Sequence, residues 1–390
     1  LHLMRFILVV LFSKLVGLLI TVTRKGSGTT WPGHIALRLF PAILRNSRFV
    51  FKKGVIVISG TNGKTTTAKL CHHILSGLDY KVLHNKTGGN ILNGIVSTYI
   101  NGLKRVTCFD YDFGVLEVDE FVLPELLSHM HVDVLVLLNL SRDQLDRYGE
   151  LDIIIEKWTQ CINSSAVGSL ILHKDEKHFA PIVTTYKGSI TFFDDDPAAR
   201  RRTSLLGNFN SKNVNAALLA CRHLGIADDA ILSQLSTFSA AYGRGEIIEY
   251  FDKFYQVFLA KNPASFNNNL DILIYSKDTE ELELEYDALL FILNDEVRDG
   301  RDVSWIYDIN PVKLSKACFE KTVFVSGDRA YEMALRLQYA GVGVDNANVD
   351  PSLKHTIDKI HQTDISQLIV LPNYSSMLHF RRLTLGKEIL

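Results

Sequence analysis

One segment restricts this chain more than any other: an apolar, β-branched run that ends in a glycine turn. Residues 55–67 read VIVISGTNGKTTT. The apolar run predicts a buried strand, and the residues after Lys64 are compatible with a helix. Gly60 and Gly63 allow the main chain to turn with its N–H groups facing inward, and the start of a helix adds further unpaired donors. The segment therefore predicts a cradle for phosphate groups.

Two side chains of this cradle suit the chemistry of a nucleotide. Lys64 supplies a point charge for the β- and γ-phosphates, and the Thr65 hydroxyl suits Mg²⁺. The common pattern G-x-x-x-x-G-K-[ST] would place a glycine at position 58, where this chain has Ile58. The loop is therefore expected to be a shortened variant that begins at Gly60. A chance glycine turn before a helix is the alternative, but the order of strand, turn, Lys and Thr favours the phosphate site.

Length and composition narrow the remaining possibilities. A chain of 390 residues is too long for a single core, so two or three domains are expected. A formal net charge of −1 gives no global basic field of the kind that nucleic-acid-binding proteins use. The five cysteines are widely spaced and include no C-x-x-C pair, which supports neither a zinc ribbon nor a disulfide framework. A reducing cytoplasm is the expected location.

The N-terminal region is unusually apolar over residues 6–22. A membrane-spanning helix needs about 20 apolar residues, and Lys14 lies near the middle of this run. No small-residue cleavage site follows, so a signal peptide fits poorly. We favour a helix packed on the protein over a helix on a membrane surface, and both over a true span.

Short apolar runs then alternate with helical periodicity. This pattern predicts a parallel sheet covered on both faces, which is a doubly wound, P-loop-containing nucleotide-binding domain of the α/β class. The expected strands are residues 55–59, 81–84, 113–118, 132–138 and 169–172. The expected helices are residues 65–76, 90–101, 121–129, 151–163 and 211–224, the last opened by Asn210 and ended by Gly225. The charge-rich residues 174–204 predict a hairpin and a solvated loop.

A boundary is expected near residues 240–245, where Tyr-Gly-Arg-Gly interrupts the pattern. A second and smaller α/β domain, of Rossmann-like type, should follow it. Its expected strands are residues 255–260, 288–294, 322–326 and 367–371, and its expected helices are residues 311–318, 328–340 and 351–362. The predicted organisation is an N-terminal apolar helix and linker packed on the central domain (1–45), a central ATP-binding domain (46–240) and a C-terminal domain (241–390).

Acidic residues follow one of the apolar strands of the central domain. A bound nucleotide needs a divalent cation, and carboxylates at the ends of neighbouring strands would hold it. Glu117 closes such a strand and is the leading Mg²⁺ ligand, with Asp119 and Glu120 as its neighbours. The alternative is a negative charge at the start of the next helix, which suits Glu120 better than Glu117.

Two further polar segments lie after predicted buried elements. Residues 138–150, LNLSRDQLDRYGE, follow an apolar strand and are expected at the mouth of a cleft, with a plain polar loop as the alternative. Residues 207–217 read GNFNSKNVNAA, in which Asn210 and Asn213 are three positions apart and share a helix face. An asparagine amide can read the edge of an adenine. The alternative is a helix N-cap with surface polar residues.

These motifs, in this order, resemble the Mur ligase superfamily. The resemblance rests on GTNGKTT at residues 60–66, the strand-end Glu117, DQLDR at 143–147 and G-x-x-N-x-x-N-x-x-A-A at 207–217. The second half of the chain resembles the MurT branch of that superfamily, whose members are the ATP-using subunits of lipid II isoglutaminyl synthase. The motifs that carry this are LAKNPA at 259–264, LND at 293–295 and DGRDVSWIYD at 299–308.

The resemblance implies an activity and a set of site residues. ATP with Mg²⁺ would convert the α-carboxyl of D-glutamate in the peptidoglycan stem peptide of lipid II into an acyl phosphate. Ammonia from a GatD-type glutaminase, the partner in a heterodimer, would then form D-isoglutamine. By resemblance Lys64 and Glu117 are catalytic, and Thr65 and Glu117 hold Mg²⁺. The implied nucleotide contacts are Gly60, Thr61, Asn62, Gly63, Lys64, Thr65, Thr66, Asn210, Arg244 and Asn267.

The resemblance also assigns an acidic residue to the partner's active site. Asp302 would complete the Cys–His–Asp triad of the glutaminase, with Asp308 in reserve. The alternatives for Asp302 are a loop cap or a partner for Arg301. The implied substrate is lipid-linked, so the inner face of the cell membrane is a second expected location beside the cytoplasm.

The sequence departs from its relatives in two places. Residues 174–204 contain no cysteine, whereas many MurT proteins have a four-cysteine zinc ribbon, so no structural zinc is expected. Gln144 stands where many Mur ligases have a metal-binding histidine, which weakens the case for a second Mg²⁺.

Two other functions remain open. The alternatives are a Mur-type ligase that adds an amino acid to a peptide or folate-like acceptor, and a non-catalytic nucleotide-binding scaffold.

Overall fold

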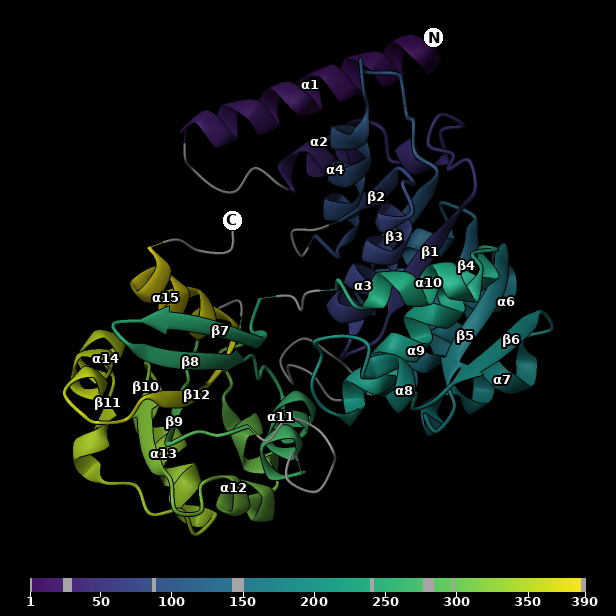
Figure 1. Cartoon of the computed structure of the whole chain (residues 1–390). Helices are drawn as coiled ribbons and strands as arrows, with labels where there is room; N and C mark the ends of the chain where they lie inside the picture. The colour runs from purple at the N-terminus through teal and green to yellow at the C-terminus, as the bar shows by residue number, and fades with distance from the viewer. Residues whose placement is uncertain are drawn as a thin grey trace. The chain divides into compact units, whose positions relative to one another are not determined.

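A computed structural model describes residues 2–23, 30–85, 89–141, 151–238, 242–275, 284–296 and 299–386. The DQLDR motif at 143–147, with Gln144, lies outside the described residues. The chain forms two compact units (Figure 1). Among the described residues, unit 1 holds 2–141, 151–204 and 210–238, and unit 2 holds 205–209 and the residues from 242 onward.

Unit 1 is built on a six-stranded, all-parallel sheet in the order β2-β3-β1-β4-β5-β6. Its strands are β1 (Gly54–Ser59), β2 (Val82–His84), β3 (Phe113–Glu117), β4 (Val132–Leu137), β5 (Val167–His173) and β6 (Ser189–Phe193). The five strands predicted between residues 55 and 172 are all present. Strand β1 lies between β3 and β4, so the strand order reverses there. The C-terminal end of β1 is thus the switch point at which such sheets bind ligands.

Helices cover both faces of this sheet. On one face, Val55 and Val57 of β1 belong to a large apolar core that includes Ile95, Leu126 and Trp158 from three different helices. Helix α3 packs on β1, β2 and β3 and contributes to no part of that core, since it covers the opposite face. The helices are α1 (His2–Thr23), α2 (Trp31–Leu39), α3 (Lys64–Gly77), α4 (Leu92–Gly102), α5 (Leu123–Leu127), α6 (Leu151–Ser164), α7 (Ala180–Thr185), α8 (Pro197–Arg200), α9 (Asn208–His223) and α10 (Asp228–Leu235), with short 3₁₀ turns at η1 (Ile43–Arg45) and η2 (Lys177–Phe179).

The N-terminal helix α1 packs on unit 1 along one side only. Phe6, Val9 and Val10 are buried in the large core, and the ring of Phe6 lies 5.6 Å from that of Phe49. Helix α2 begins at Trp31, and Pro32 occupies its first turn, where proline is well tolerated.

The hairpin predicted over residues 174–204 is wrong. Strand β6 pairs in parallel with β5, and a parallel pair needs a crossover, which α7 supplies. The stretch buries Phe179, Ile182 and Phe193, but these are too widely spaced among charged residues to show a clear period. The charge runs are not wholly solvated either, since Arg200 is only 3% exposed.

Unit 2 has a second six-stranded sheet, in the order β11-β10-β9-β12-β8-β7. All its neighbouring strands are parallel except β7 and β8, which form a hairpin. The two loop residues of that hairpin, Phe251 and Asp252, have φ values of +47° and +58°, as a type I′ turn requires. The strands are β7 (Arg244–Tyr250), β8 (Lys253–Phe258), β9 (Ala288–Ile292), β10 (Thr322–Ser326), β11 (Val349–Asp350) and β12 (Gln367–Pro372).

The four strands and three helices predicted for this unit are present, together with elements that were not predicted. Strand β7 starts inside the Tyr-Gly-Arg-Gly run that was taken as a boundary, and α11 starts in an asparagine-rich stretch of weak helix propensity. The buried Asn262 offsets that weakness, because its Oδ1 accepts from Ser265 N at 2.8 Å. The helices are α11 (Pro263–Tyr275), α12 (Pro311–Ala317), α13 (Ala330–Tyr339), α14 (Leu353–His361) and α15 (Tyr374–Leu385), with 3₁₀ turns at η3 (Ser304–Asp308) and η4 (Asn346–Asn348).

The close approach of α2 and α4 depends on Gly33. A Cβ at this position would lie 1.8 Å from Asn93 O, and Gly33 N donates to Ser97 Oγ at 2.7 Å. We therefore expect Gly33→Ala to lower the free energy of unfolding of unit 1 by about 1–3 kcal/mol, because the helices must separate. Urea denaturation followed by circular dichroism measures this. Gly343→Ala, where a Cβ meets nothing within 4 Å, is the matched control. Equal stability of the two variants would contradict the predicted packing.

Candidate functional site

The turn between β1 and α3 is closed tightly enough to need both of its glycines. Gly60 has a φ of +130°, and a Cβ there would lie 2.9 Å from Asn139 O. Gly63 has a φ of +92°, and its Cβ would lie 2.3 Å from Asn213 Oδ1. Both φ values disfavour any side chain. Ile58 is a fully buried strand residue, so the loop begins at Gly60 as the sequence predicts.

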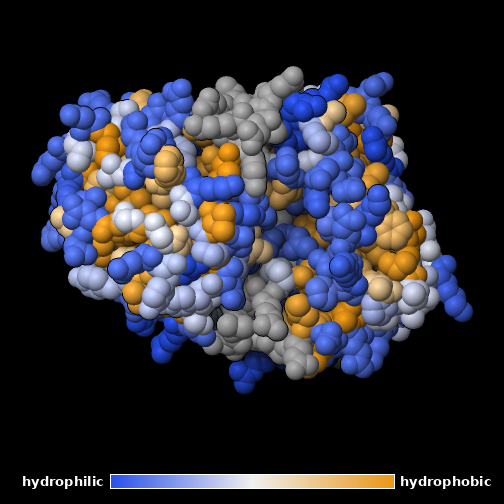
Figure 2. Space-filling model, turned by 90° about the horizontal axis from the view of Figure 1, so that it is seen from below, coloured by the Kyte–Doolittle hydropathy of each residue, from blue (hydrophilic) through white to orange (hydrophobic). Residues whose placement is uncertain are grey.

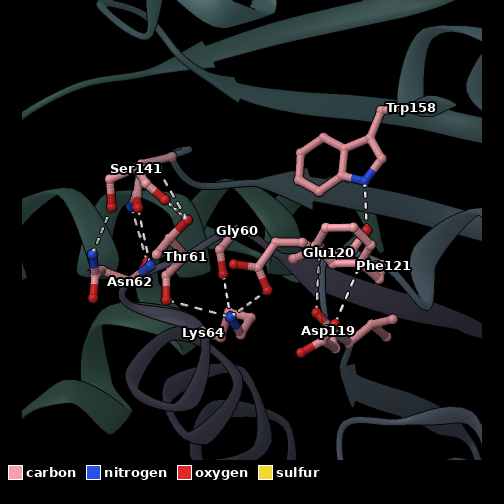
Figure 3. A network of polar contacts seen from close by, with 12 residues as sticks. Gly60, Thr61, Asn62, Lys64, Asp119, Glu120, Phe121, Ser141 and Trp158 are labelled. Atoms are coloured by element: carbon pink, nitrogen blue, oxygen red, sulfur yellow. Dashed lines mark hydrogen bonds and ion pairs between the residues drawn. The ribbon is translucent and has the colours of Figure 1, made fainter. Parts of the chain in front are cut away.

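Residues that follow β4 hold this turn in shape. The Asn139 side chain accepts from Asn62 N and donates to Asn62 O, both at 2.9 Å, while its main-chain carbonyl accepts from Thr61 N at 2.9 Å. Ser141 N donates to Thr61 Oγ1 at 3.0 Å, and Asn62 Nδ2 donates to Ser141 Oγ at 3.3 Å (Figure 3). Residues 138–150, which follow β4, were predicted to lie at the mouth of a cleft because of their charged side chains. Among the residues described, Asn139 and Ser141 form the hydrogen bonds that fix the turn.

The ammonium group of Lys64 lies inside the turn. Lys64 Nζ donates to the carbonyls of Gly60 and Thr61, and it pairs with Glu120 Oε2 at 2.9 Å (Figure 3). The residue is only 7% exposed. Burial by itself lowers the pKa of Lys64, but the negative charges of Glu120 and Glu117 outweigh it and raise the pKa above the usual value. A fixed positive charge is therefore held at the centre of the turn.

The acidic residues after β3 lie next to this charge. Glu117 is buried, and its main chain is fixed by Asn85, which accepts from Glu117 N at 2.9 Å and donates to Glu117 O at 2.7 Å. Glu120 is also buried, and its carbonyl accepts from Trp158 Nε1 at 2.8 Å. Glu120 is not a charge on a helix N-terminus, because its carboxylate pairs with Lys64 and α5 begins only at Leu123. Sequence reasoning ranked Glu117 first and missed this pairing.

The two asparagines of α9 share a face, as predicted. Asn213 Nδ2 donates to Asn210 Oδ1 at 3.0 Å, and both residues are buried. Asn210 does not open the helix, which starts at Asn208, and neither residue is a surface polar group. Since Asn213 also abuts Gly63, the motif on α9 and the glycine turn belong to one site.

The donor set of this site fits a nucleotide phosphate with a divalent cation. The 14-residue helix α3 begins at Lys64. Its N-cap residue is Gly63, which has no side chain to accept hydrogen bonds from the N–H groups of the first turn. Main-chain donors and the positive end of the helix dipole therefore face the turn. Thr65 is exposed in the first turn of α3, so its hydroxyl is available to a cation, and Glu117 supplies a nearby carboxylate. Thr66 is buried.

A second polar loop lies in unit 2. Asp302 is exposed, and its Oδ1 accepts from Ser304 N at 2.8 Å, which lowers the pKa of its carboxyl group. This is the loop-cap contact considered for Asp302, and it leaves the carboxyl group at the surface. Asp308, also exposed, ends η3. The buried Asp299 fastens the same loop to α15, because its carboxylate accepts from Ser375 N at 3.0 Å, while burial raises its pKa.

The remaining predicted residues, Arg244 and Asn267, lie in β7 and α11 of unit 2. Asn267 Oδ1 accepts from Asn310 N at 2.9 Å and so fixes the start of α12. Their contact with a nucleotide stays a prediction. Asp299 opens the DGRDVSWIYD motif, but its role could not be predicted, since it depends on a helix that starts 75 residues later.

Comparison with known proteins identifies relatives of both halves of the chain. Residues 58–202 match the Mur ligase middle domain, and residues 259–377 match the MurT ligase C-terminal domain. The chain is 29% identical to the lipid II isoglutaminyl synthase (glutamine-hydrolyzing) subunit MurT of Staphylococcus aureus, over 90% of this chain and 91% of the relative. It is 24% identical to the MurT subunit of Streptococcus pneumoniae, over 94% and 95%. The MurF ligase of Thermotoga maritima, solved in complex with ADP, has a similar fold, with a TM-score of 0.66 and 16% identity over 89% of this chain and 82% of that one.

The pair between Lys64 and Glu120 is expected to matter for stability. Replacing Glu120 by Gln removes the carboxylate that compensates a buried ammonium group, so we expect a loss of about 3 kcal/mol in the free energy of unfolding. Denaturant titration measures the loss. Glu125→Gln, at an exposed position of the same unit, should change stability by less than about 0.5 kcal/mol. Adding Lys64→Met to Glu120→Gln should restore part of the loss, and the absence of any restoration would argue against a direct pair.

Trp158 should report on occupation of the turn. Its ring is fully buried and bonded to Glu120 O, so any ligand that draws Lys64 away from Glu120 alters its surroundings. We expect a saturable change in tryptophan fluorescence as Mg²⁺ and ATP are added. The change should vanish in Trp158→Phe and survive in Trp31→Phe and Trp305→Phe, which replace the other two tryptophans. A signal that persists without Trp158 would place the ligand elsewhere.

Proposed function

Since the chain belongs to the Mur ligase superfamily and has the domain combination of its MurT branch, we propose that it is the ATP-using subunit of a lipid II isoglutaminyl synthase. In this role it is an ATP-dependent carbon–nitrogen ligase. It amidates the α-carboxyl of D-glutamate in the stem peptide of lipid II, which gives D-isoglutamine. The observation that carries the proposal is the glycine turn with its central Lys64 cation, in a chain that also matches the MurT C-terminal domain.

The proposed chemistry divides into two transfers. A carboxylate is a poor electrophile, so its oxygen first attacks the γ-phosphorus of ATP, which releases ADP and leaves an acyl phosphate. The nitrogen of ammonia then attacks the acyl carbon, phosphate leaves, and the nitrogen loses a proton. Both steps need charge stabilisation and alignment more than covalent chemistry from the protein. Lys64 and the main-chain donors at the start of α3 would supply this stabilisation and alignment.

Lys64 must change partners for this to happen. Its ammonium group contacts Gly60 O, Thr61 O and Glu120. We propose that the phosphates of ATP take over these contacts, so the cation is already desolvated when they arrive. Thr65 and Glu117 would hold Mg²⁺, which supplies further neutralisation of the phosphate charges when bound. Asn210, Arg244 and Asn267 would contact the nucleotide.

Ammonia would come from a GatD-type glutaminase subunit in a heterodimer. Asp302 fits the role of third triad member, because its carboxyl group is exposed while one oxygen is fixed by Ser304 N. It would orient the partner's histidine and stabilise its positive charge. Asp308 is the reserve candidate. We place the reaction in the cytoplasm, close to the membrane that holds the lipid-linked substrate.

The runner-up is a Mur-type ligase that adds an amino acid to a peptide or folate-like acceptor. It would use the same turn and the same acyl phosphate, so unit 1 does not separate the two. The match of residues 259–377 to the MurT C-terminal domain favours amidation. An amino-acid ligase turns over with its amino acid alone, whereas the proposed subunit needs glutamine and its partner, or free ammonium at high pH.

Co-expression with a candidate glutaminase, followed by mass spectrometry of lipid II, tests the proposal. We expect a shift of about one mass unit, as OH is replaced by NH₂, that requires ATP and glutamine. Lys64→Ala should abolish the shift and the hydrolysis of ATP. Asp302→Asn should abolish it with glutamine but keep it with ammonium, because only the partner's triad is affected.

Two exposed residues provide matched controls, Lys157→Ala for the lysine and Asp358→Asn for the aspartate. Both should leave the amidation of lipid II unchanged. ATP hydrolysis that survives Lys64→Ala would instead support a non-catalytic scaffold. Full glutamine-dependent activity in Asp302→Asn would remove Asp302 from the triad and turn attention to Asp308.

A further inference from the structure

Helix α1 presents an apolar surface on its outer side as well as on its inner side. In Figure 1 it lies along one border of unit 1, with α2 and α4 on its inner side. Eight large apolar side chains of α1 are between about one half and two thirds exposed: Leu3, Met4, Leu8, Leu11, Phe12, Leu15, Leu18 and Leu19. Met4, Leu8, Leu11, Leu15 and Leu18 follow the spacing of three and four residues that forms one stripe along a helix.

This stripe is larger than the single exposed apolar residues that soluble proteins usually have. On the face of the molecule in Figure 2, hydrophobic residues lie in patches interrupted by hydrophilic ones. From Met4 to Leu18 the stripe is about 21 Å long at 1.5 Å per residue. Such a surface in water is unfavourable, so it is expected to be covered by something.

The charges around the stripe identify the kind of partner. The first 53 residues contain nine Lys or Arg and no Asp or Glu, in a chain whose net charge is −1. The positive charge is therefore concentrated in the segment that carries the apolar stripe, and the rest of the chain is negative. Arg5, Arg38 and Arg45 of this segment are exposed. An apolar helix face with neighbouring cations and no carboxylates matches an anionic membrane surface. A second copy of the chain would bring like charges together.

The contacts of α1 favour a helix that lies in the membrane surface over one that crosses it. Within the described residues α1 is the single helix long and apolar enough to span a bilayer, but its inner side belongs to unit 1. Lys14 Nζ donates to Leu103 O at 2.7 Å, and Arg5 Nη2 donates to Leu39 O at 2.6 Å. Phe6 packs on Phe49. A spanning orientation would break all of these contacts.

We propose that α1 is an in-plane membrane anchor, whose outer stripe inserts into the interface of an anionic bilayer while its inner side stays packed on unit 1. The proposal deepens the proposed function, since it names the surface that brings unit 1 to a lipid-linked substrate. It rests on the side chains and charges of α1 and its neighbours, however, and not on the ligase activity.

Co-sedimentation of the full chain with vesicles tests the anchor, in the absence of ATP and lipid II. We expect strong binding to vesicles of phosphatidylcholine mixed with phosphatidylglycerol and weaker binding to phosphatidylcholine alone. Raising the salt to about 0.5 M should weaken the first without abolishing it, because screening removes attraction but not apolar insertion. Leu8→Glu with Leu15→Glu should reduce binding at least about tenfold, since two inserted leucines become charged.

The matched control is Phe251→Glu with Phe319→Glu, two apolar residues of unit 2 that are each 69% exposed. This pair should leave vesicle binding unchanged, and thermal unfolding should show that both double variants are folded. Equal binding of the two double variants, or no binding by the natural chain, would overturn the proposal. Self-association abolished by Leu8→Glu with Leu15→Glu, without vesicle binding, would assign the stripe to a second copy. Bound protein that resists extraction with alkaline carbonate would show a spanning helix instead.

The ligase assay separates this result from the proposed function. The Leu8→Glu, Leu15→Glu variant should still amidate a soluble, short-chain analogue of lipid II together with its partner. A chain that binds vesicles but amidates nothing would keep the anchor and lose the function.

Discussion

The site of unit 1 depends on one interaction, the burial of the Lys64 ammonium group between the carbonyls of its own turn and the Glu120 carboxylate. A buried cation is costly unless it is paired and hydrogen-bonded, and here both conditions are met. The turn, the end of β3 and, through Trp158, helix α6 are all connected to it. The turn therefore already contains a desolvated positive charge. A phosphate group would meet it without first having to remove water from it.

The sequence was sufficient to predict the turn, because everything that defines it is local. A β-branched strand, two glycines, a lysine and a helix follow one another within 13 residues, and each forms for its own short-range reason. Asn210 and Asn213 could be placed on one face for the same reason. The pairing of Glu120 with Lys64 could not be predicted, since it joins residues 56 positions apart and depends on the loop after β3. The side chain of Asn139, which brackets Asn62 from another strand, was missed on the same grounds.

The errors in the predicted fold have physical causes of a similar kind. Residues 174–204 bury only a few apolar side chains per element, so tertiary contacts rather than periodicity decide that β6 runs parallel to β5. Helix α11 contradicts its own weak propensity and is started by the Asn262 cap. Strand β7 forms at a sheet edge although Gly245 lies near its start, because the turn at Phe251 and Asp252 fixes its register against β8. In each case a paired strand, a tight turn or a single cap outweighs the local pattern.

The attachment of the loop of unit 2 to α15 has a consequence for any protein that docks there. Asp299 fixes the segment three residues before Asp302, and Ser304 N fixes the carboxyl group itself. A flexible loop would lose conformational freedom on association and so weaken the complex. This loop has already lost that freedom during folding. An incoming protein would thus find a rigid acidic contact point, and the strength of association would depend on shape and charge rather than on ordering the chain.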